Sequence, residues 1–255
     1  MNTEKDISQL YNSLFKLEAK FKKEVVYPIH KKLYFTENFI DIYDYLISKI
    51  NCSDKTILDA GCGVGYGSFL FANQNAKQVT GLSLSEEEIK RAKETKTHLK
   101  IENIAFELRS FDEVSKQYDL IFCVESLKHS LAIEKSFDTL LNALTVNGQL
   151  IIVDDFFDTI ENKNSKQLQK DWHLNELISE KHLAPFRSKF NVETEDLTSL
   201  MKLKPMIKIY SQMLFFRVFK QNSPYKKLFK GGILLDYLYT KKQMKYKLVI
   251  LTKNK

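Results

Sequence analysis

Four of the eight glycines in this 255-residue chain lie within seven positions, at Gly61, Gly63, Gly65 and Gly67. They follow the short apolar run 56–60 and precede a segment with helical spacing. Glycine permits positive φ angles and lets a ligand approach bare backbone, and the N–H groups at a helix start favour polar or anionic groups. The spacing predicts a ligand-binding turn between the first strand and the first helix of a parallel sheet.

This turn differs from the dinucleotide-binding fingerprint, because Tyr66 stands where that pattern needs its third glycine. The segment from Ile57 to Gly65 closely resembles the first motif of the class I S-adenosylmethionine-dependent methyltransferases. The resemblance extends from about Tyr11 to Leu251. It implies an α/β fold with a Rossmann-like, doubly wound, seven-stranded sheet whose last strand is antiparallel. It also implies S-adenosyl-L-methionine as cofactor, with S-adenosyl-L-homocysteine as product.

The resemblance assigns the cofactor to the ends of the first four strands. The residues it implies there are Asp59, Gly61, Cys62, Gly63, Gly65, Ser83, Leu84, Ser110, Phe111 and Cys123. Asp59 would hold the cofactor's ammonium group, and Ser110 and Phe111 would meet its adenine. The second strand lacks the usual acidic residue for the ribose, so Ser83 and Leu84 would meet the ribose and adenine, and Glu88 could join them or serve only as a capping residue. Its ending, Gly-Leu-Ser-Leu-Ser, resembles the tocopherol, sterol and cyclopropane-synthase branch, which acts on small molecules.

The stretch that follows the fourth strand, from Glu125 to His129, resembles the Glu-Ser-x-Glu-His segment of the tocopherol-type branch, with Lys128 in place of a carboxylate. By this resemblance Glu125 and His129 point into the substrate cleft. His129 could orient or deprotonate a hydroxyl group, and Glu125 could accept a proton or pair with a cationic intermediate. A purely structural role for each residue stays open.

The elements that must position these residues follow from hydrophobic periodicity. Strands are predicted at 56–60, 77–82, 104–108, 119–124, 149–153, 190–197 and 246–251. Between them, helices are predicted at 65–72, 85–99, 130–144, 165–182, 198–220 and 224–242, and the one over 198–220 is expected to be interrupted or kinked at Pro205. This alternation predicts right-handed crossovers and a parallel sheet. Ser85 is the expected N-cap of its helix, with Glu88 as a capping-box partner.

Residues 1–52 are predicted to form an N-terminal helical lid, with helices over 6–24 and, capped by Thr36, over 36–50. By the same resemblance, four lid residues are candidates for contacts with the cofactor: Tyr11, Tyr27, His30 and Tyr34. The methyltransferase domain would span 53–255. Its basic and apolar helical cap, at about 198–244, would be inserted before the last strand.

The formal net charge of +7 is unevenly distributed. Residues 1–50 carry +1, residues 51–155 carry −5, and residues 156–255 carry +11. This pattern fits an ordinary lysine-rich surface, an anionic substrate, nucleic acid or contact with an anionic membrane surface. The cap could also be a core helix or the interface of a homodimer.

Asp154 and Asp155 suggest a metal pair, but consecutive strand residues point to opposite faces, so no metal site is predicted. The cysteines Cys52, Cys62 and Cys123 form no paired motif, and the first residues lack a signal-peptide pattern. We therefore expect a reduced, cytoplasmic compartment.

Missing motifs narrow the substrate class. The chain has no Pro-Pro or Pro-Cys dipeptide, no zinc-ligand cluster and no appended RNA-binding module, which argues against DNA and disfavours RNA. The expected function is methylation at oxygen, nitrogen or carbon of a small, hydrophobic metabolite that could be anionic. The alternatives are an RNA or protein methyltransferase, or a non-catalytic partner protein that kept the cofactor pocket.

Overall fold

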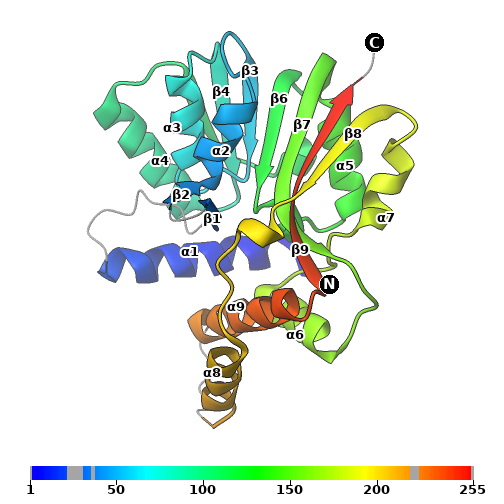
Figure 1. Cartoon of the computed structure of the whole chain (residues 1–255). Helices are drawn as coiled ribbons and strands as arrows, with labels where there is room; N and C mark the ends of the chain where they lie inside the picture. The colour runs from blue at the N-terminus through cyan, green and yellow to red at the C-terminus, as the bar shows by residue number, and fades with distance from the viewer. Residues whose placement is uncertain (1, 22–30, 36–37, 219–223, 254–255) are drawn as a thin grey trace.

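Seven strands form one sheet in the order β5-β4-β3-β6-β7-β9-β8 in the computed structural model, which describes residues 2–21, 31–35, 38–218 and 224–253. The strands are β3 (Thr56–Ala60), β4 (Gln78–Ser83), β5 (Ile104–Leu108), β6 (Tyr118–Val124), β7 (Leu144–Phe157), β8 (Phe190–Asp196) and β9 (Met244–Lys253). Strands β3 to β7 are parallel, whereas β9 runs antiparallel to both of its neighbours, β7 and β8. The predicted doubly wound sheet with an antiparallel last strand is confirmed (Figure 1).

Helices cover both faces of this sheet because its central strands are apolar on both sides. The surrounding elements are α2 (Ile42–Lys49), α3 (Tyr66–Asn73), α4 (Glu86–Leu99), α5 (Ile133–Asn142), α6 (Lys163–Trp172) and α7 (Glu180–Leu183). One buried cluster contains Phe71, which stacks on Phe122 with ring centroids 4.2 Å apart. The other cluster contains Phe137 and Phe156. The two clusters hold the strand ends, and so the loops after them, in fixed positions.

The N-terminal region contains α1 (Glu4–Phe21), as predicted, but the helix predicted over 36–50 is wrong in its first part. Strands β1 (Lys32–Phe35) and β2 (Asn38–Asp41) form an antiparallel hairpin, and α2 begins only at Ile42. Asp41 caps α2 by accepting the N–H of Tyr43 at 2.9 Å. The predicted cap, Thr36, lies outside the described residues. Pairing with the preceding strand therefore overrides the helical spacing of this segment.

The helix predicted over 165–182 is shorter than expected. Helix α6 begins at the N-cap Asn162 and ends at Trp172, and His173 follows in the left-handed conformation with φ of 55°. A loop then leads to α7. The two capping residues explain both ends of α6. Each forms hydrogen bonds with backbone groups that have no partner inside the helix at its ends.

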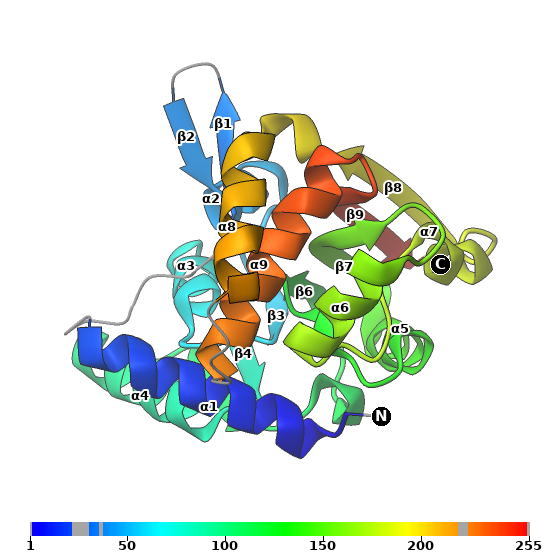
Figure 2. The ribbon, with the colours of Figure 1, turned by 90° about the horizontal axis from the view of Figure 1, so that it is seen from below.

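The cap lies between β8 and β9 and contains α8 (Met206–Val218) and α9 (Pro224–Thr240). The helix predicted over 198–220 is wrong before Pro205, where a short 3₁₀ turn (Thr198–Leu200) and a bridge from Met201 to Leu33 replace it. Figure 2, seen from below, shows α1, α6, α8 and α9 gathered at one end of the sheet. Among the described residues, no helix combines the length and apolar character needed to cross a membrane.

Candidate active site

A cavity of about 560 Å³ lies at the carboxyl ends of the parallel strands, where open α/β sheets bind ligands. The turns after β3, β4, β5 and β6 form its floor. Helix α1 adds a wall of Ile7, Tyr11, Leu14 and Phe15. The volume is in the range of sites that enclose small molecules.

The glycine turn presents bare backbone to this cavity. Gly61, Gly63 and Gly65 have φ angles of 93°, 54° and 86°. The N–H groups of Gly61 and Cys62 both donate to the Leu82 carbonyl, at 2.9 and 2.8 Å, which fixes the turn to β4. A Cβ added to Gly61 would overlap the Ser126 side chain, whereas one added to Gly63 would meet nothing within 4 Å. The backbone of Gly63 therefore leaves open room of the kind that the predicted cofactor requires.

The structure brings most of the predicted cofactor residues to this cavity. Those that line it are Gly61, Cys62, Gly63, Ser83, Leu84, Ser110 and Phe111. The other three do not line it. Asp59 is buried beneath the turn and accepts the Ser68 hydroxyl at 2.7 Å, Gly65 caps α3, and Cys123 is fully buried in the apolar cluster below. Contacts between the ten residues and a cofactor stay predictions.

Glu88 supplies a carboxylate where the end of β4 lacks one. Its oxygen accepts the Ser83 hydroxyl at 2.7 Å, and both residues line the cavity. Ser85 caps α4 as predicted and accepts the Glu88 N–H at 3.2 Å. The side chain of Glu88 thus reaches β4, where a ribose hydroxyl would be expected.

His129 is the predicted catalytic residue with the most unusual surroundings. Its Nε2 lies 2.6 Å from the Tyr11 hydroxyl, and no group among the described residues pairs with its buried Nδ1. Burial and the positive charge of Lys128 lower the pKa of His129 to about 3. Burial also raises the pKa of Tyr11. The imidazole is therefore neutral near pH 7, and the residue lines the cavity.

This low pKa predicts acid sensitivity. The unfolded chain protonates His129 below about pH 6.5, but the folded chain does so only near pH 3, so stability falls as the pH falls through this window. The slope is up to about 1.4 kcal/mol per pH unit. Urea unfolding of His129→Gln should show a shallower loss of stability between these pH values than the wild type. Replacement of the exposed His98 by glutamine should leave the slope unchanged, and equal slopes for all three proteins would contradict the prediction.

Five charged residues beneath the cavity form what we call the buried charge cluster: Lys31, Glu125, Lys128, Asp154 and Asp155. Lys128 Nζ lies 2.7 Å from Asp155 and 3.1 Å from Asp154. Lys31 Nζ lies 2.7 Å from Asp155 and 3.6 Å from Glu125. Although Asp154 and Asp155 are consecutive in β7, the long Lys128 side chain reaches both of them.

Lys128 and Asp155 keep their charges in spite of burial. Burial opposes the charge of Lys128, but the carboxylates of Asp154, Asp155 and Glu125 outweigh this effect and raise its pKa well above the usual value. Burial likewise opposes the charge of Asp155, yet Lys128 and Lys31 lower its pKa. For Asp154 burial dominates and raises the pKa. Among the described residues, no group of three or more His, Cys, Asp or Glu side chains is arranged to hold a metal ion.

Glu125 is held in a conformation that non-glycine residues seldom adopt, with φ of 53°. Its N–H donates to the Val153 carbonyl at 2.7 Å. Its carboxylate accepts the Lys31 N–H at 3.1 Å and the Tyr246 hydroxyl at 2.9 Å. Such strain persists only where the surroundings enforce it, and it is commonly found at functional sites.

Removal of Lys128 should destabilise the fold, because it leaves Asp154 and Asp155 buried without their shared cation. We expect Lys128→Met to lower the free energy of unfolding by about 3–5 kcal/mol in urea titrations. The matched control is Lys49→Met. It breaks an ion pair of 2.7 Å with Glu195 at the surface, and should cost less than about 1 kcal/mol. Equal losses for the two variants would contradict a structural role for the cluster.

Several cavity residues were missed from the sequence. The Trp172 indole donates to the Leu228 carbonyl at 2.9 Å, and both residues line the cavity with Phe229. The one available signal was that Trp172 is the single tryptophan of the chain. Of the predicted lid residues, Tyr11 lines the cavity but Tyr34 does not. Tyr27 and His30 lie outside the described residues.

Comparison with known proteins finds sequence similarity to methyltransferases. The sequence profile of a family described as "Methyltransferase domain" matches residues 51–208. A tRNA U34 carboxymethyltransferase of Campylobacter curvus (strain 525.92) is 25% identical over 171 residues, 60% of this chain and 57% of that protein. A ubiquinone biosynthesis O-methyltransferase of Pseudomonas fluorescens (strain Pf0-1) is 28% identical over 153 residues, 58% of each chain. The matches thus span somewhat more than half the length of these curated relatives.

Solved structures share the fold over nearly the whole chain. The [4+2]-cyclase SpnF aligns with a TM-score of 0.75 at 16% identity and covers 99% of this chain and 96% of its own. A geranyl diphosphate methyltransferase in complex with GPP and sinefungin aligns with a TM-score of 0.74 at 15% identity, covering 98% and 97%. At such identities the likeness concerns the fold alone.

Proposed function

The chain belongs to the methyltransferase domain family, within class I of the S-adenosylmethionine-dependent enzymes, and on this premise we propose that it methylates a small, mainly apolar molecule. The observation that carries the proposal is the cavity, which has the open backbone of Gly63 and the neutral His129 among its lining residues. S-adenosylmethionine supplies an electrophilic methyl group and its own leaving group. The chain must then hold donor and acceptor in line and exclude water.

The cofactor half of the cavity follows from the family motif. We assign the backbone of Gly61 and Gly63 to the methionine and ribose side, and Ser110 with Phe111 to the adenine side. Glu88 and Ser83 are the polar groups available for the ribose hydroxyls. Carboxylate and hydroxyl oxygens suit that role because both accept hydrogen bonds.

The acceptor half is apolar. Ile7 and Leu14 from α1, Trp172 from α6, and Leu228 with Phe229 from α9 supply walls without charge. The charged residues that line the cavity are Glu4, Arg109, Asp112, Lys128, Glu88 and Glu125. Acidic side chains outnumber basic ones in this cavity lining, and Lys128 is already paired with two aspartates. These charges favour a neutral acceptor over the anionic one that the basic cap suggested.

His129 and Tyr11 are the groups that would handle a proton of the acceptor. A neutral imidazole can take a proton from a hydroxyl or an acidic carbon–hydrogen group as the methyl group transfers. The Tyr11 hydroxyl holds the ring through Nε2, which leaves Nδ1 without a partner among the described residues. Glu125, fixed by Lys31 and Tyr246, would stabilise positive charge that develops nearby.

Transfer of label tests this proposal. The protein would be incubated with S-adenosylmethionine labelled on its methyl group and with matched pairs of lipophilic acceptors, one neutral and one carrying a carboxylate. We expect label in the neutral member of a pair. If calorimetry finds no affinity for S-adenosylmethionine, the family-based site is wrong. If S-adenosylmethionine binds but no small acceptor becomes labelled, the proposed substrate class is wrong and the cofactor site is unaffected.

Transfer RNA is the second candidate acceptor. The similarity to a tRNA U34 carboxymethyltransferase and the net charge of +11 over residues 156–255 favour it. The same assay with total tRNA distinguishes the two, because only an RNA enzyme would label nucleic acid. The structural similarity to a [4+2]-cyclase indicates that proteins of this fold catalyse more than one type of reaction. A cofactor-binding protein without transfer would bind S-adenosylmethionine and label nothing.

A further inference from the structure

We propose that the outer face of the cap docks on the surface of an anionic phospholipid bilayer. Five large apolar side chains are exposed there, and we call them the cap patch. They are Ile207, Tyr210, Leu214 and Phe215 of α8 and Phe229 of α9, with exposed fractions of 81%, 51%, 61%, 54% and 46%. Elsewhere in the described chain, exposed large apolar residues occur in more scattered positions. A contiguous patch of this kind marks an interaction site.

The patch exists because α8 is apolar on more than one side. Ile209 is fully buried and Met213 is partly buried against the core, on the inner side of the helix. Ile207, Tyr210 and Leu214 follow one another at spacings of three and four, so they share the opposite, outer face. Figure 1 places α8 at the lower extremity of the molecule, and Figures 1 and 2 both show it beside α9. No described element covers its outer face.

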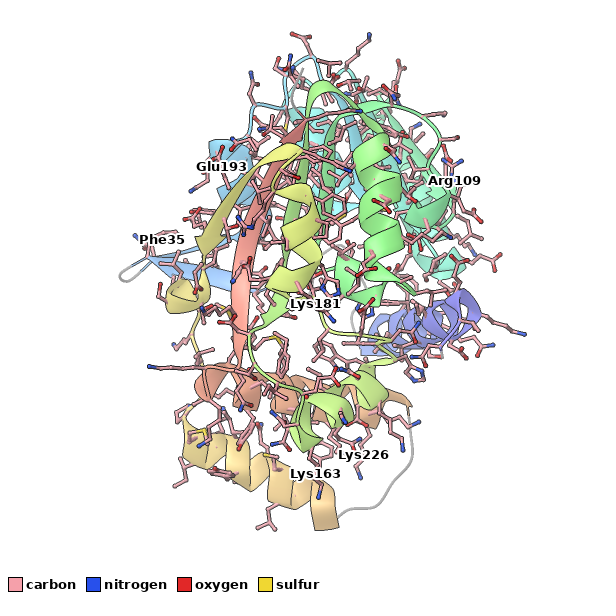
Figure 3. All side chains as sticks on the ribbon, turned by 90° about the vertical axis from the view of Figure 1, so that its right-hand side faces the viewer. Phe35, Arg109, Lys163, Lys181, Glu193 and Lys226 are labelled. Carbon is pink, nitrogen blue, oxygen red and sulfur yellow. The ribbon has the colours of Figure 1, made fainter. Side chains whose placement is uncertain are left out.

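Positive charge surrounds the patch. Residues 198–244 contain ten basic side chains and a single acidic one, Asp236, which pairs with Lys204 at 2.6 Å. Lys208 is exposed on α8 next to Ile207, and Lys226 lies over the Phe216 ring at 5.5 Å. Figure 3 places Lys226 at the same end of the molecule as α8. Lysines beside exposed apolar groups suit the headgroup region of an anionic bilayer.

The patch is continuous with the cavity. Phe229 belongs to both, because it is half-exposed in the patch and also lines the cavity beside Leu228. Docking would bring this side of the cavity to the bilayer, from which an apolar acceptor could enter without crossing water. This last step rests on the proposed function, whereas docking itself rests only on the patch and its charge.

Two other occupants fit the patch less well. A second copy would set two strongly basic caps against each other, and like charges repel across an interface. A nucleic acid would satisfy the lysines, but it offers little that would cover aliphatic groups such as Ile207 and Leu214. A bilayer meets both requirements at once. It pairs its phosphates with the lysines and removes the aliphatic side chains from water.

Co-sedimentation with vesicles tests the proposal. The full chain should sediment with vesicles of mixed phosphatidylglycerol and phosphatidylcholine and stay in solution with phosphatidylcholine alone. The double variant Ile207→Ser/Leu214→Ser removes apolar contact, and Lys208→Glu reverses one charge. We expect each to weaken partitioning by about tenfold. Thermal unfolding and affinity for S-adenosylmethionine should match the wild type, because none of these residues lines the cavity.

Matched controls lie away from the cap. Leu108→Ser and Val146→Ser remove apolar residues that are similarly exposed, and Lys77→Glu reverses an exposed charge; all three should sediment like the wild type. Absence of wild-type binding to the anionic vesicles would overturn docking, as would equal binding by the cap variants. Docking on a bilayer would also be overturned if the wild type formed a dimer or bound RNA in solution and the variant Ile207→Ser/Leu214→Ser did not. Loss of docking with retained cofactor affinity and transfer would leave the proposed function intact.

Discussion

Gly63→Arg is expected to lower the affinity for S-adenosylmethionine by at least about a hundredfold, equivalent to about 2.8 kcal/mol, while the protein stays folded. A Cβ at this position meets no protein atom within 4 Å, so the new side chain would occupy the space that the cofactor needs. The φ angle of 54° costs a non-glycine residue about 1–2 kcal/mol, which a folded domain can tolerate. Calorimetric titration measures the affinity, and urea unfolding measures the fold.

Two controls separate the causes of this loss. Gly63→Ala carries the same backbone cost without filling the cavity, so it should keep most of the affinity. Gly232→Arg adds the same side chain on α9, where a Cβ also meets nothing within 4 Å and the residue does not line the cavity. It should bind like the wild type. Undiminished binding by folded Gly63→Arg would place the cofactor elsewhere.

His129→Ala is expected to reduce kcat by about a hundredfold or more, with the dissociation constant of S-adenosylmethionine changed by less than about threefold. The reason is that His129 lines the cavity, has a ring nitrogen without a partner among the described residues, and stays neutral down to a pKa of about 3. The kcat of the wild type should therefore show no loss attributable to His129 between about pH 5 and pH 8. Transfer of label to the acceptor found by screening provides the measurement.

The companion variants sharpen this prediction. Glu125→Gln keeps the shape of a side chain that accepts from Lys31 and Tyr246 but removes its charge, so a loss of kcat would indicate an electrostatic role. His98→Ala, at an exposed site on α4, should be unaffected. Unchanged kcat in both His129→Ala and Glu125→Gln would show that the two residues only stabilise the loop after β6.

The sheet could be predicted from sequence because its central strands contain short apolar runs, and several of them are followed by a helix, such as the one capped by Ser85. Two of the misread segments are set by strand pairing and not by helical spacing. The strand from Asn38 to Asp41 forms because Lys32 to Phe35 pairs with it, and Met201 leaves the helical pattern to bridge Leu33. Helical spacing alone contains no information about such pairing.

The candidate site also has one part that the sequence predicts and another part that only the folded structure shows. The glycine turn is local, so a nine-residue motif sufficed to locate Gly61 and Gly63 at the cavity. The buried charge cluster is not local, because it joins Lys31, Lys128 and Asp155 from three separate parts of the chain. Trp172 and Phe229 likewise enter the site from helices that follow the motif by more than a hundred residues. Only the packed fold reveals those contributions.

The pairing of β8 with β9 has a consequence for how this enzyme family can diversify. These two strands are adjacent and antiparallel, so the whole of α8 and α9 is topologically an enlarged hairpin loop. Residues can be gained or lost in that loop without a shift in strand register, and the donor-side turns at the opposite half of the sheet would not be disturbed. Grafting a foreign connection between Asp196 and Met244 is thus a route to new acceptors on an unchanged catalytic scaffold.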